Sequence, residues 1–137
     1  MIAPMARPTN ALIVEDEAHV RVFLRLLLKE VGIETVWEAG DGAQALVLAG
    51  QHRPELVLLD VNLPIMNGLE VLEHLAAEHP AMPVIMVTSQ SAMKTVLESV
   101  KLGAIAYILK QSPNAESLKM LRDAIDGLAN GDAAEET

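Results

Sequence analysis

The chain has 137 residues, no cysteine and a formal net charge of −9, from 19 acidic and 10 basic residues. This length fits one compact domain, and the acidic balance argues against direct binding to nucleic acid, whose phosphates require clustered Lys and Arg. The lack of cysteine excludes disulfides and thiolate metal sites. Because no apolar run reaches the ~20 residues of a membrane-spanning helix, we expect no membrane insertion and a cytoplasmic location.

Short apolar runs recur along the chain and predict strands. The clearest runs are Leu12–Val14, Leu56–Leu59, Val84–Val87 and Ile105–Leu109, and a less apolar stretch at Ile33–Trp37 predicts an edge strand. Continuous rather than alternating apolarity is typical of parallel strands that are covered on both faces.

Helical patterns separate these runs. The longest apolar stripe follows i, i+3, i+4, i+7, i+8 and i+11 spacing. Its residues are Val20, Phe23, Leu24, Leu27, Leu28 and Val31. Asp41 with Gln44 and Asn67 with Glu70 form capping-box pairs that predict helix starts, and Gly32 is typical of a residue just past a helix end. Five strands alternating with five helices predict an α/β fold, a doubly wound parallel sheet with helices on both faces.

We expect the folded domain to cover residues 9–130. Residues 1–8 are predicted to be a flexible N-terminal segment, and residues 131–137 an acidic flexible tail. The sequence contains no internal repeat and no linker long enough to join a second domain.

Charged and hydroxyl side chains follow four of the predicted strands. Glu15 and Asp16 follow the first strand, Asp60 the third, Thr88 the fourth and Lys110 the fifth. Ligands of doubly wound sheets bind beyond the carboxyl ends of the strands, where these side chains converge. Two like charges ~4 Å apart repel by roughly 4 kcal/mol at an effective dielectric of ~20, and Mg²⁺ relieves such repulsion between carboxylates. Asp60 is then a candidate nucleophile that forms an acyl phosphate.

The order and spacing of these residues resemble the receiver domains of two-component response regulators. The matching stretches are Leu12–Glu17, Leu58–Gly68, Val87–Ser89, Gly103–Ala104 and Tyr107–Lys110. The resemblance covers nearly the whole chain and implies a flavodoxin-like (βα)5 fold with strand order 2-1-3-4-5.

The resemblance implies a Mg²⁺ site. Its ligands would be Glu15, Asp16, Asp60 and the backbone carbonyl of Asn62, with Asp16 binding directly and Glu15 through water. Asp60 is also the implied site of phosphorylation. Glu15 stands where aspartate is commoner in the family, but its longer side chain still reaches a metal-bound water.

Four further residues take roles from the same resemblance. Thr88 and Lys110 match the groups that bind the phosphoryl oxygens. Tyr107 matches an aromatic switch residue that turns inward when Thr88 moves toward the phosphoryl group. Gln90 matches a position that tunes the rate of dephosphorylation, as does Asn62.

One departure from the family concerns the residue after Lys110. The family usually has proline there, often after a cis peptide bond, whereas this chain has Gln111. A cis bond before a non-proline residue costs ~2.5–4 kcal/mol, so we expect a trans bond between Lys110 and Gln111. This difference affects the path of the loop and the direction in which the Lys110 side chain points.

The implied function is phosphorelay signalling. The partner would be a histidine kinase or a histidine phosphotransfer protein, and a downstream protein would bind roughly residues 91–127. Both a stand-alone regulator and a receiver cut from a longer protein fit the sequence.

Two alternatives compete with this function. A receiver-like binding module that is never phosphorylated is disfavoured by the acidic cluster, although Gln111 leaves room for it. A Mg²⁺ phosphohydrolase commonly needs a second carboxylate two residues after the nucleophile, and Asn62 at that position cannot act as an acid. The sequence therefore predicts a protein that catalyses only its own phosphorylation and the slow loss of its own phosphate, and not a multiple-turnover enzyme.

Overall fold

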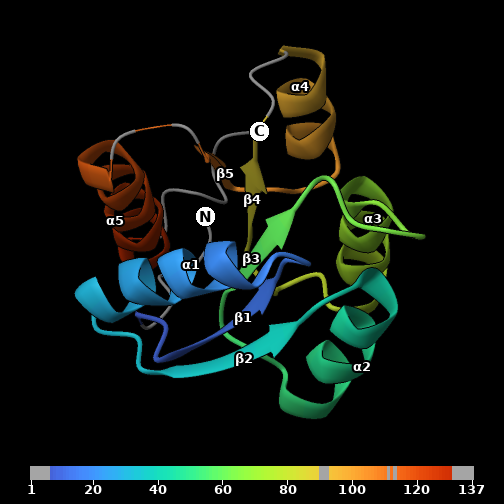
Figure 1. The fold of residues 1–137 in the computed structure, drawn as a ribbon, viewed down its shortest axis with the longest axis horizontal. Coiled ribbons are helices and arrows are strands. Elements are labelled where there is room, and N and C mark those ends of the chain that lie inside the picture. The colour runs from blue at the N-terminus through green and yellow to red at the C-terminus, as the bar shows by residue number, and fades with distance from the viewer. Residues whose placement is uncertain (1–6, 90–92, 111, 113, 131–137) are drawn as a thin grey trace.

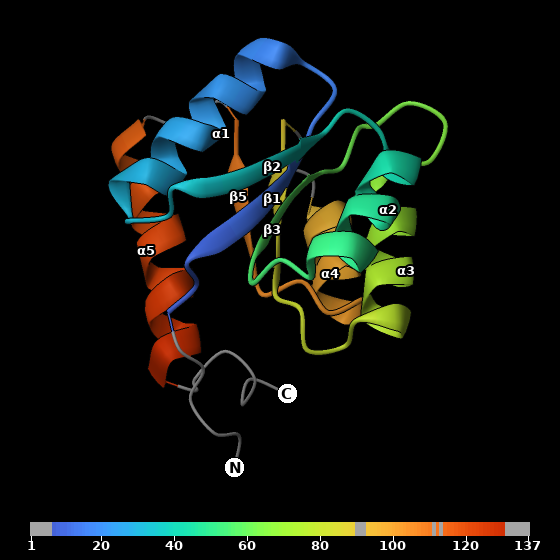
Figure 2. The ribbon, with the colours of Figure 1, turned by 90° about the horizontal axis from the view of Figure 1, so that it is seen from below.

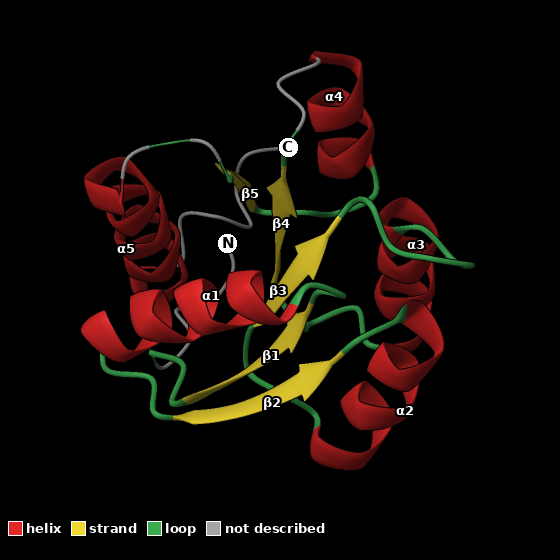
Figure 3. Cartoon of the chain, viewed as in Figure 1, coloured by secondary structure: helices red, strands yellow, loops and turns green. Residues whose placement is uncertain are grey.

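In the computed structural model, five strands alternate with five helices (Figures 1 and 3). The structure describes residues 7–89, 93–110, 112 and 114–130. The strands are β1 (Asn10–Val14), β2 (Thr35–Ala39), β3 (Val57–Asp60), β4 (Val84–Thr88) and β5 (Ala106–Leu109). The helices are α1 (Ala18–Glu30), α2 (Gly42–His52), α3 (Gly68–Glu78), α4 (Met93–Lys101) and α5 (Asn114–Asn130).

The strands form one parallel sheet in the order β2-β1-β3-β4-β5. Helices α1 and α5 cover one face of the sheet, and α2, α3 and α4 cover the other (Figure 2). The predicted doubly wound fold and strand order are confirmed, and β2 is an edge strand as expected. No helix in the part of the chain that the structure describes is long and apolar enough to cross a membrane.

Each face of the sheet has its own aliphatic core. Along β1, Leu12 and Val14 point into the core on the side of α2 and α3, whereas Ala11 and Ile13 point into the core on the side of α1 and α5. All four side chains are fully buried. Burial on both faces is the reason that the strands are continuously apolar.

The edge strand starts two residues later than predicted. The amide of Gly32 (φ +88°) donates to the carbonyl of Lys29, and the amide of Ile33 donates to that of Leu28. These two bonds form a Schellman motif. Ile33 therefore ends α1 and anchors its end in the core, and β2 begins only at Thr35.

The two predicted capping boxes have different outcomes. At α3, Asn67 and Glu70 exchange both side-chain bonds, so this capping box is confirmed. At α2, the side chain of Asp41 accepts from the Gln44 amide as predicted. The side chain of Gln44, however, accepts from Gly40 and not from Asp41. The second half of that prediction is wrong, because Gln44 reaches the loop one residue further back.

Helix α3 begins against the backbone that carries Asp60. The amide of Gly68 donates to the carbonyl of Val61 at 2.8 Å. A Cβ atom at Gly68 would lie 2.1 Å from the Asp60 carbonyl oxygen and 2.7 Å from the Val61 Cα atom. Only glycine permits this approach, which fixes the position of the loop after β3.

We predict that Gly68→Ala lowers the free energy of unfolding by about 1–3 kcal/mol, because the added methyl group must displace backbone. Gly50→Ala is the matched control: Gly50 lies within α2, and no neighbouring atom lies within 4 Å of an added Cβ. This control should raise the free energy of unfolding by about 0.5–1 kcal/mol. Urea denaturation of both variants measures the two effects, and equal responses would contradict the close approach at Gly68.

Candidate functional site

The site lies where the carboxyl ends of β1, β3, β4 and β5 meet. Glu15 and Asp16 directly follow β1, Asp60 ends β3, Thr88 ends β4 and Lys110 directly follows β5. In the sheet register, the last residues of these neighbouring strands lie within one position of each other. The hydrogen bonding between β4 and β5 extends to Lys110, whose amide donates to the Thr88 carbonyl at 2.9 Å. The predicted convergence of these five residues is confirmed.

Three carboxylates form a cluster that could hold a cation. Glu15, Asp16 and Asp60 each offer an oxygen atom, and these oxygens lie within 4.8 Å of one another. Glu15 is 0% exposed and Asp60 is 1% exposed, whereas Asp16 is exposed to solvent. A set of hard oxygen ligands that is open on one side suits Mg²⁺, which retains water and substrate oxygens among its ligands.

Lys110 bridges the two buried carboxylates. Its Nζ atom lies 2.8 Å from Glu15 Oε1 and 3.2 Å from Asp60 Oδ2. Backbone amides bind the remaining oxygens: Glu17 donates to Glu15 Oε2 at 3.1 Å, and Asn62 donates to Asp60 Oδ1 at 3.2 Å. Each of the two buried carboxylates is thus held by the ammonium group of Lys110 and by one backbone amide.

The electrostatics of the site follow from this burial. Burial raises the pKa of Glu15 and the pKa of Asp60, against the lowering effect of Lys110 on both groups. Burial alone would lower the pKa of Lys110, but the hydrogen bond to Glu15 and the charges of both carboxylates outweigh it, so this pKa is raised. The two buried carboxyl groups therefore take up protons more readily than free ones, although Lys110 lies between them.

Thr88, Tyr107 and Asn62 are the other predicted site residues that the structure describes. Thr88 is buried at the end of β4, and Tyr107 is half-buried in β5, the strand next to it. The Asn62 side chain is exposed, and its described contact with Asp60 is made by its backbone amide. Gln90 and Gln111 lie outside the described residues, so the tuning role and the trans bond stay predictions.

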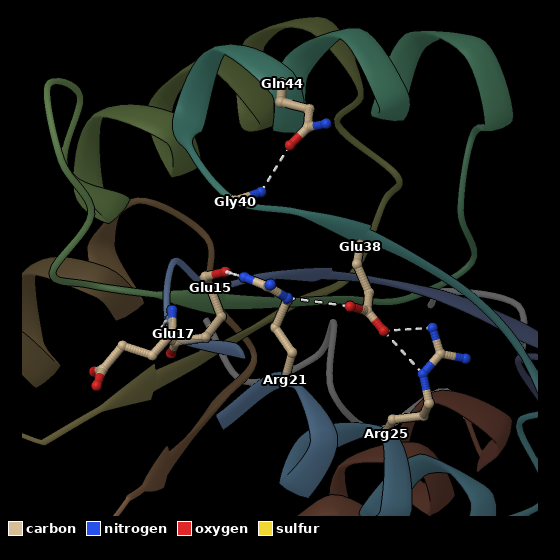
Figure 4. A network of polar contacts seen from close by, with 7 residues as sticks. All are labelled: Glu15, Glu17, Arg21, Arg25, Glu38, Gly40 and Gln44. Carbon is tan, nitrogen blue, oxygen red and sulfur yellow. Dashed lines mark hydrogen bonds and ion pairs between the residues drawn. The ribbon is translucent and has the colours of Figure 1, made fainter. Parts of the chain in front are cut away.

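The sequence analysis missed an arginine that contacts the site. Arg21 in α1 donates through Nη1 to the backbone carbonyl of Glu15 at 2.7 Å and through Nε to Glu38 Oε1 at 3.1 Å (Figure 4). Arg25, one turn later, binds the other oxygen of Glu38. Nothing in the helical pattern distinguishes these two arginines, so the sequence carried no signal for this contact.

Comparisons with known proteins agree on one family. The response regulator receiver domain family matches residues 11–122. The transcriptional regulatory protein PdtaR of Mycobacterium tuberculosis is 40% identical over 108 residues, which cover 79% of this chain and 52% of that protein. Protein CcdB of Bacillus subtilis is 36% identical over 102 residues, which cover 74% of this chain and 85% of that protein.

A solved structure shows the same fold. The crystal structure of a CheY-like response regulator receiver domain protein from Methanospirillum hungatei matches with a TM-score of 0.80 at 27% identity, over 90% of this chain and 98% of that one. The chain spans about half the length of PdtaR and of the probable transcriptional regulatory protein TcrX, at 52% and 49%.

We predict that the metal-free protein loses stability as the pH rises above the ordinary pKa values of Glu15 and Asp60. The pKa values of Glu15 and Asp60 lie above their ordinary values of 4.5 and 3.8. Between the ordinary and the raised values, the folded state therefore binds more protons than the unfolded state, and the free energy of unfolding falls with increasing pH. Urea denaturation in EDTA measures this slope.

Two controls accompany this pH series. The double substitution Glu15→Gln with Asp60→Asn should flatten the slope, because it removes both titrating groups. Saturating Mg²⁺ should counteract the loss at neutral pH, because a ligand that binds only the folded state stabilises it. A slope that survives the double substitution would show that other groups cause it.

Proposed function

The chain belongs to the response regulator receiver domain family, and from this premise we propose that it accepts a phosphoryl group on Asp60. The donor would be the phosphohistidine of a histidine kinase or of a histidine phosphotransfer protein. One observation carries the proposal: Lys110 lies within 3.2 Å of Asp60 and 2.8 Å of Glu15, inside a cluster of three carboxylates. Such an arrangement serves a phosphoryl group that arrives with a divalent cation.

The transfer would be a single displacement at phosphorus. An oxygen of Asp60 forms a bond to phosphorus while the bond from phosphorus to the imidazole nitrogen breaks, and the electron pair of that bond stays on the nitrogen. Glu15, Asp16 and Asp60, with the backbone carbonyl of Asn62, would hold Mg²⁺. The bound ion supplies positive charge for the phosphoryl oxygens.

Lys110 and Thr88 would bind the oxygens of the transferred group. Lys110 is tied to two carboxylates in this structure, so its ammonium is already held beside the nucleophile. When the phosphoryl group arrives, the contact with Glu15 would be exchanged for a contact with a phosphoryl oxygen. Positive charge that is in place before the reaction costs no reorganisation during it.

The response to phosphorylation would reach the surface through β4 and β5. Thr88 pairs with Leu109 in the register of the two strands, and Tyr107 lies two residues earlier on β5. Tyr107 lines a pocket of about 270 Å³ together with residues of α5, among them Glu116 and Met120. We propose that Tyr107 turns inward as Thr88 moves toward the phosphoryl group, and that this reshapes the pocket.

The face formed by α4, β5 and α5 would bind the downstream protein. Leu97 and Val100 of α4 and Met120 of α5 are large apolar side chains that are exposed in this structure. They fall within the predicted output region of roughly residues 91–127. The receiver unit would extend over residues 9–130, and the output partner could be another chain or a further domain.

We predict that Asp60→Asn abolishes labelling by a small-molecule phosphodonor in the presence of Mg²⁺. The wild-type chain should gain the mass of one phosphoryl group in Mg²⁺, and no gain in mass should occur when EDTA is present during the reaction. Intact-protein mass spectrometry measures the gain. Asp41→Asn is a matched control, because Asp41 caps α2 and takes no part in the acidic cluster. Labelling of Asp60→Asn at the wild-type level would exclude Asp60 as the acceptor.

A second prediction concerns the switch residues. Tyr107 is the only tyrosine of the chain, so its aromatic NMR signals are unambiguous. Beryllofluoride with Mg²⁺, a stable mimic of the phosphoryl group, should shift these signals in the wild-type chain. Thr88→Ala should reduce the shift while still binding beryllofluoride, and Thr88→Ser, which keeps the hydroxyl, should restore it. An unchanged shift in Thr88→Ala would disconnect Thr88 from Tyr107.

A further inference from the structure

The acidic turn between β1 and α1 contains Glu15 and Asp16, and polar contacts hold the amide, the side chain and the carbonyl of Glu15. Its amide donates to the Ala39 carbonyl of β2 at 3.0 Å, and its side chain is held by Lys110 and by the Glu17 amide. The remaining polar atom is its backbone carbonyl oxygen. Arg21 Nη1 donates to this oxygen at 2.7 Å (Figure 4).

This carbonyl belongs to the peptide plane that also contains the amide of Asp16. The six atoms of a peptide unit move together because the bond is planar, so the direction of the Glu15 carbonyl sets where the Asp16 Cα atom lies. Asp16 is the exposed member of the acidic cluster and follows directly in the chain. A group that fixes the Glu15 carbonyl therefore also fixes the origin of the Asp16 side chain.

Arg21 is itself held in place by Glu38 of β2. Arg21 Nε donates to Glu38 Oε1 at 3.1 Å, and the two side chains are 24% and 31% exposed. The planar guanidinium can donate in two directions from one rigid group. Arg21 thus connects the edge strand β2 to the backbone of the acidic turn.

We propose that Arg21 is a positioning residue of the Mg²⁺ site, acting through the Glu15–Asp16 peptide. The inference rests on the proposed function, since it assumes that Glu15, Asp16 and Asp60 bind the metal. Arg21 does not contact the metal or the phosphoryl group. It holds the turn in the orientation that lets Asp16 complete the cluster with Asp60.

Arg25 provides a matched control within the same helix. It also lies in α1 and also binds Glu38, with Nε 2.9 Å from Oε2. None of the bonds described for Arg25 reaches Glu15, and its side chain is 46% exposed. Replacing either arginine removes one charge from α1 and one partner from Glu38, but only the change at Arg21 releases the Glu15 carbonyl.

The experiment compares Arg21→Met and Arg25→Met by isothermal titration with Mg²⁺, with circular dichroism to confirm folding. Methionine keeps an unbranched side chain and a good helix propensity without a donor. Outer groups that orient metal ligands typically contribute 10–100-fold in affinity, so we expect Arg21→Met to raise the Kd for Mg²⁺ by about 10-fold. Arg25→Met should keep the wild-type Kd.

Phosphorylation by a small phosphodonor gives a second measurement. Arg21→Met should be labelled slowly at low Mg²⁺ and at nearly the wild-type rate at saturating Mg²⁺, because Asp60 and Lys110 are untouched. If Arg21→Met does not fold, Arg21→Lys against Arg25→Lys replaces it. A single ammonium cannot reproduce both bonds of the guanidinium, so Arg21→Lys should still bind Mg²⁺ more weakly than its control.

Three results would overturn the inference. A wild-type Kd in Arg21→Met would show that the Glu15 carbonyl needs no such support. Equal weakening in the Arg21 and Arg25 variants would assign the effect to the Glu38 ion pairs rather than to the acidic turn. A wild-type chain that binds no Mg²⁺ and takes no label would refute the proposed function itself, and this outcome is separate from the other two because it appears before any substitution.

Discussion

The site depends on two carboxylates that are buried side by side with one ammonium group. Glu15 and Asp60 are almost fully removed from water, and each keeps a raised pKa despite its contact with Lys110. Burying unbalanced charge is costly unless partners compensate it. Three carboxylates and one lysine leave an excess of negative charge, and this excess is the basis of the proposal that the cluster binds a cation and, with the cation, a phosphoryl group.

The fold provides the means to hold these groups together. Because all five strands are parallel, their carboxyl ends lie at one edge of the sheet, and residues that are far apart in the chain meet there. Gly68 brings the start of α3 onto the backbone of Asp60, and Arg21 joins α1 to the carbonyl of Glu15. Helix contacts with the loops therefore help to position the site, in addition to the sheet.

In the proposed function, the signal would leave this edge through β4 and β5. Thr88 ends β4 inside the site, and Tyr107 lies on the neighbouring strand beside a pocket that α5 helps to form. The exposed Leu97 and Val100 of α4 lie in the proposed output region. The proposal requires a displacement of the Thr88 side chain to alter this face, and tightly packed interiors can transmit such small displacements.

The sequence by itself determined the fold class and predicted which residues meet at the carboxyl edge of the sheet. Apolar runs predicted the strands. The polar and charged residues that follow them could be assigned to one edge, because the carboxyl ends of parallel strands lie at the same edge of the sheet. It did not determine where β2 begins, because Ile33 belongs to the Schellman motif at the end of α1. It also did not determine which of Arg21 and Arg25 contacts the acidic turn. Only the tertiary structure decided these points. Local patterns encode which face of an element is buried, whereas contacts between an arginine, a distant glutamate and a backbone carbonyl depend on how the elements are placed in space.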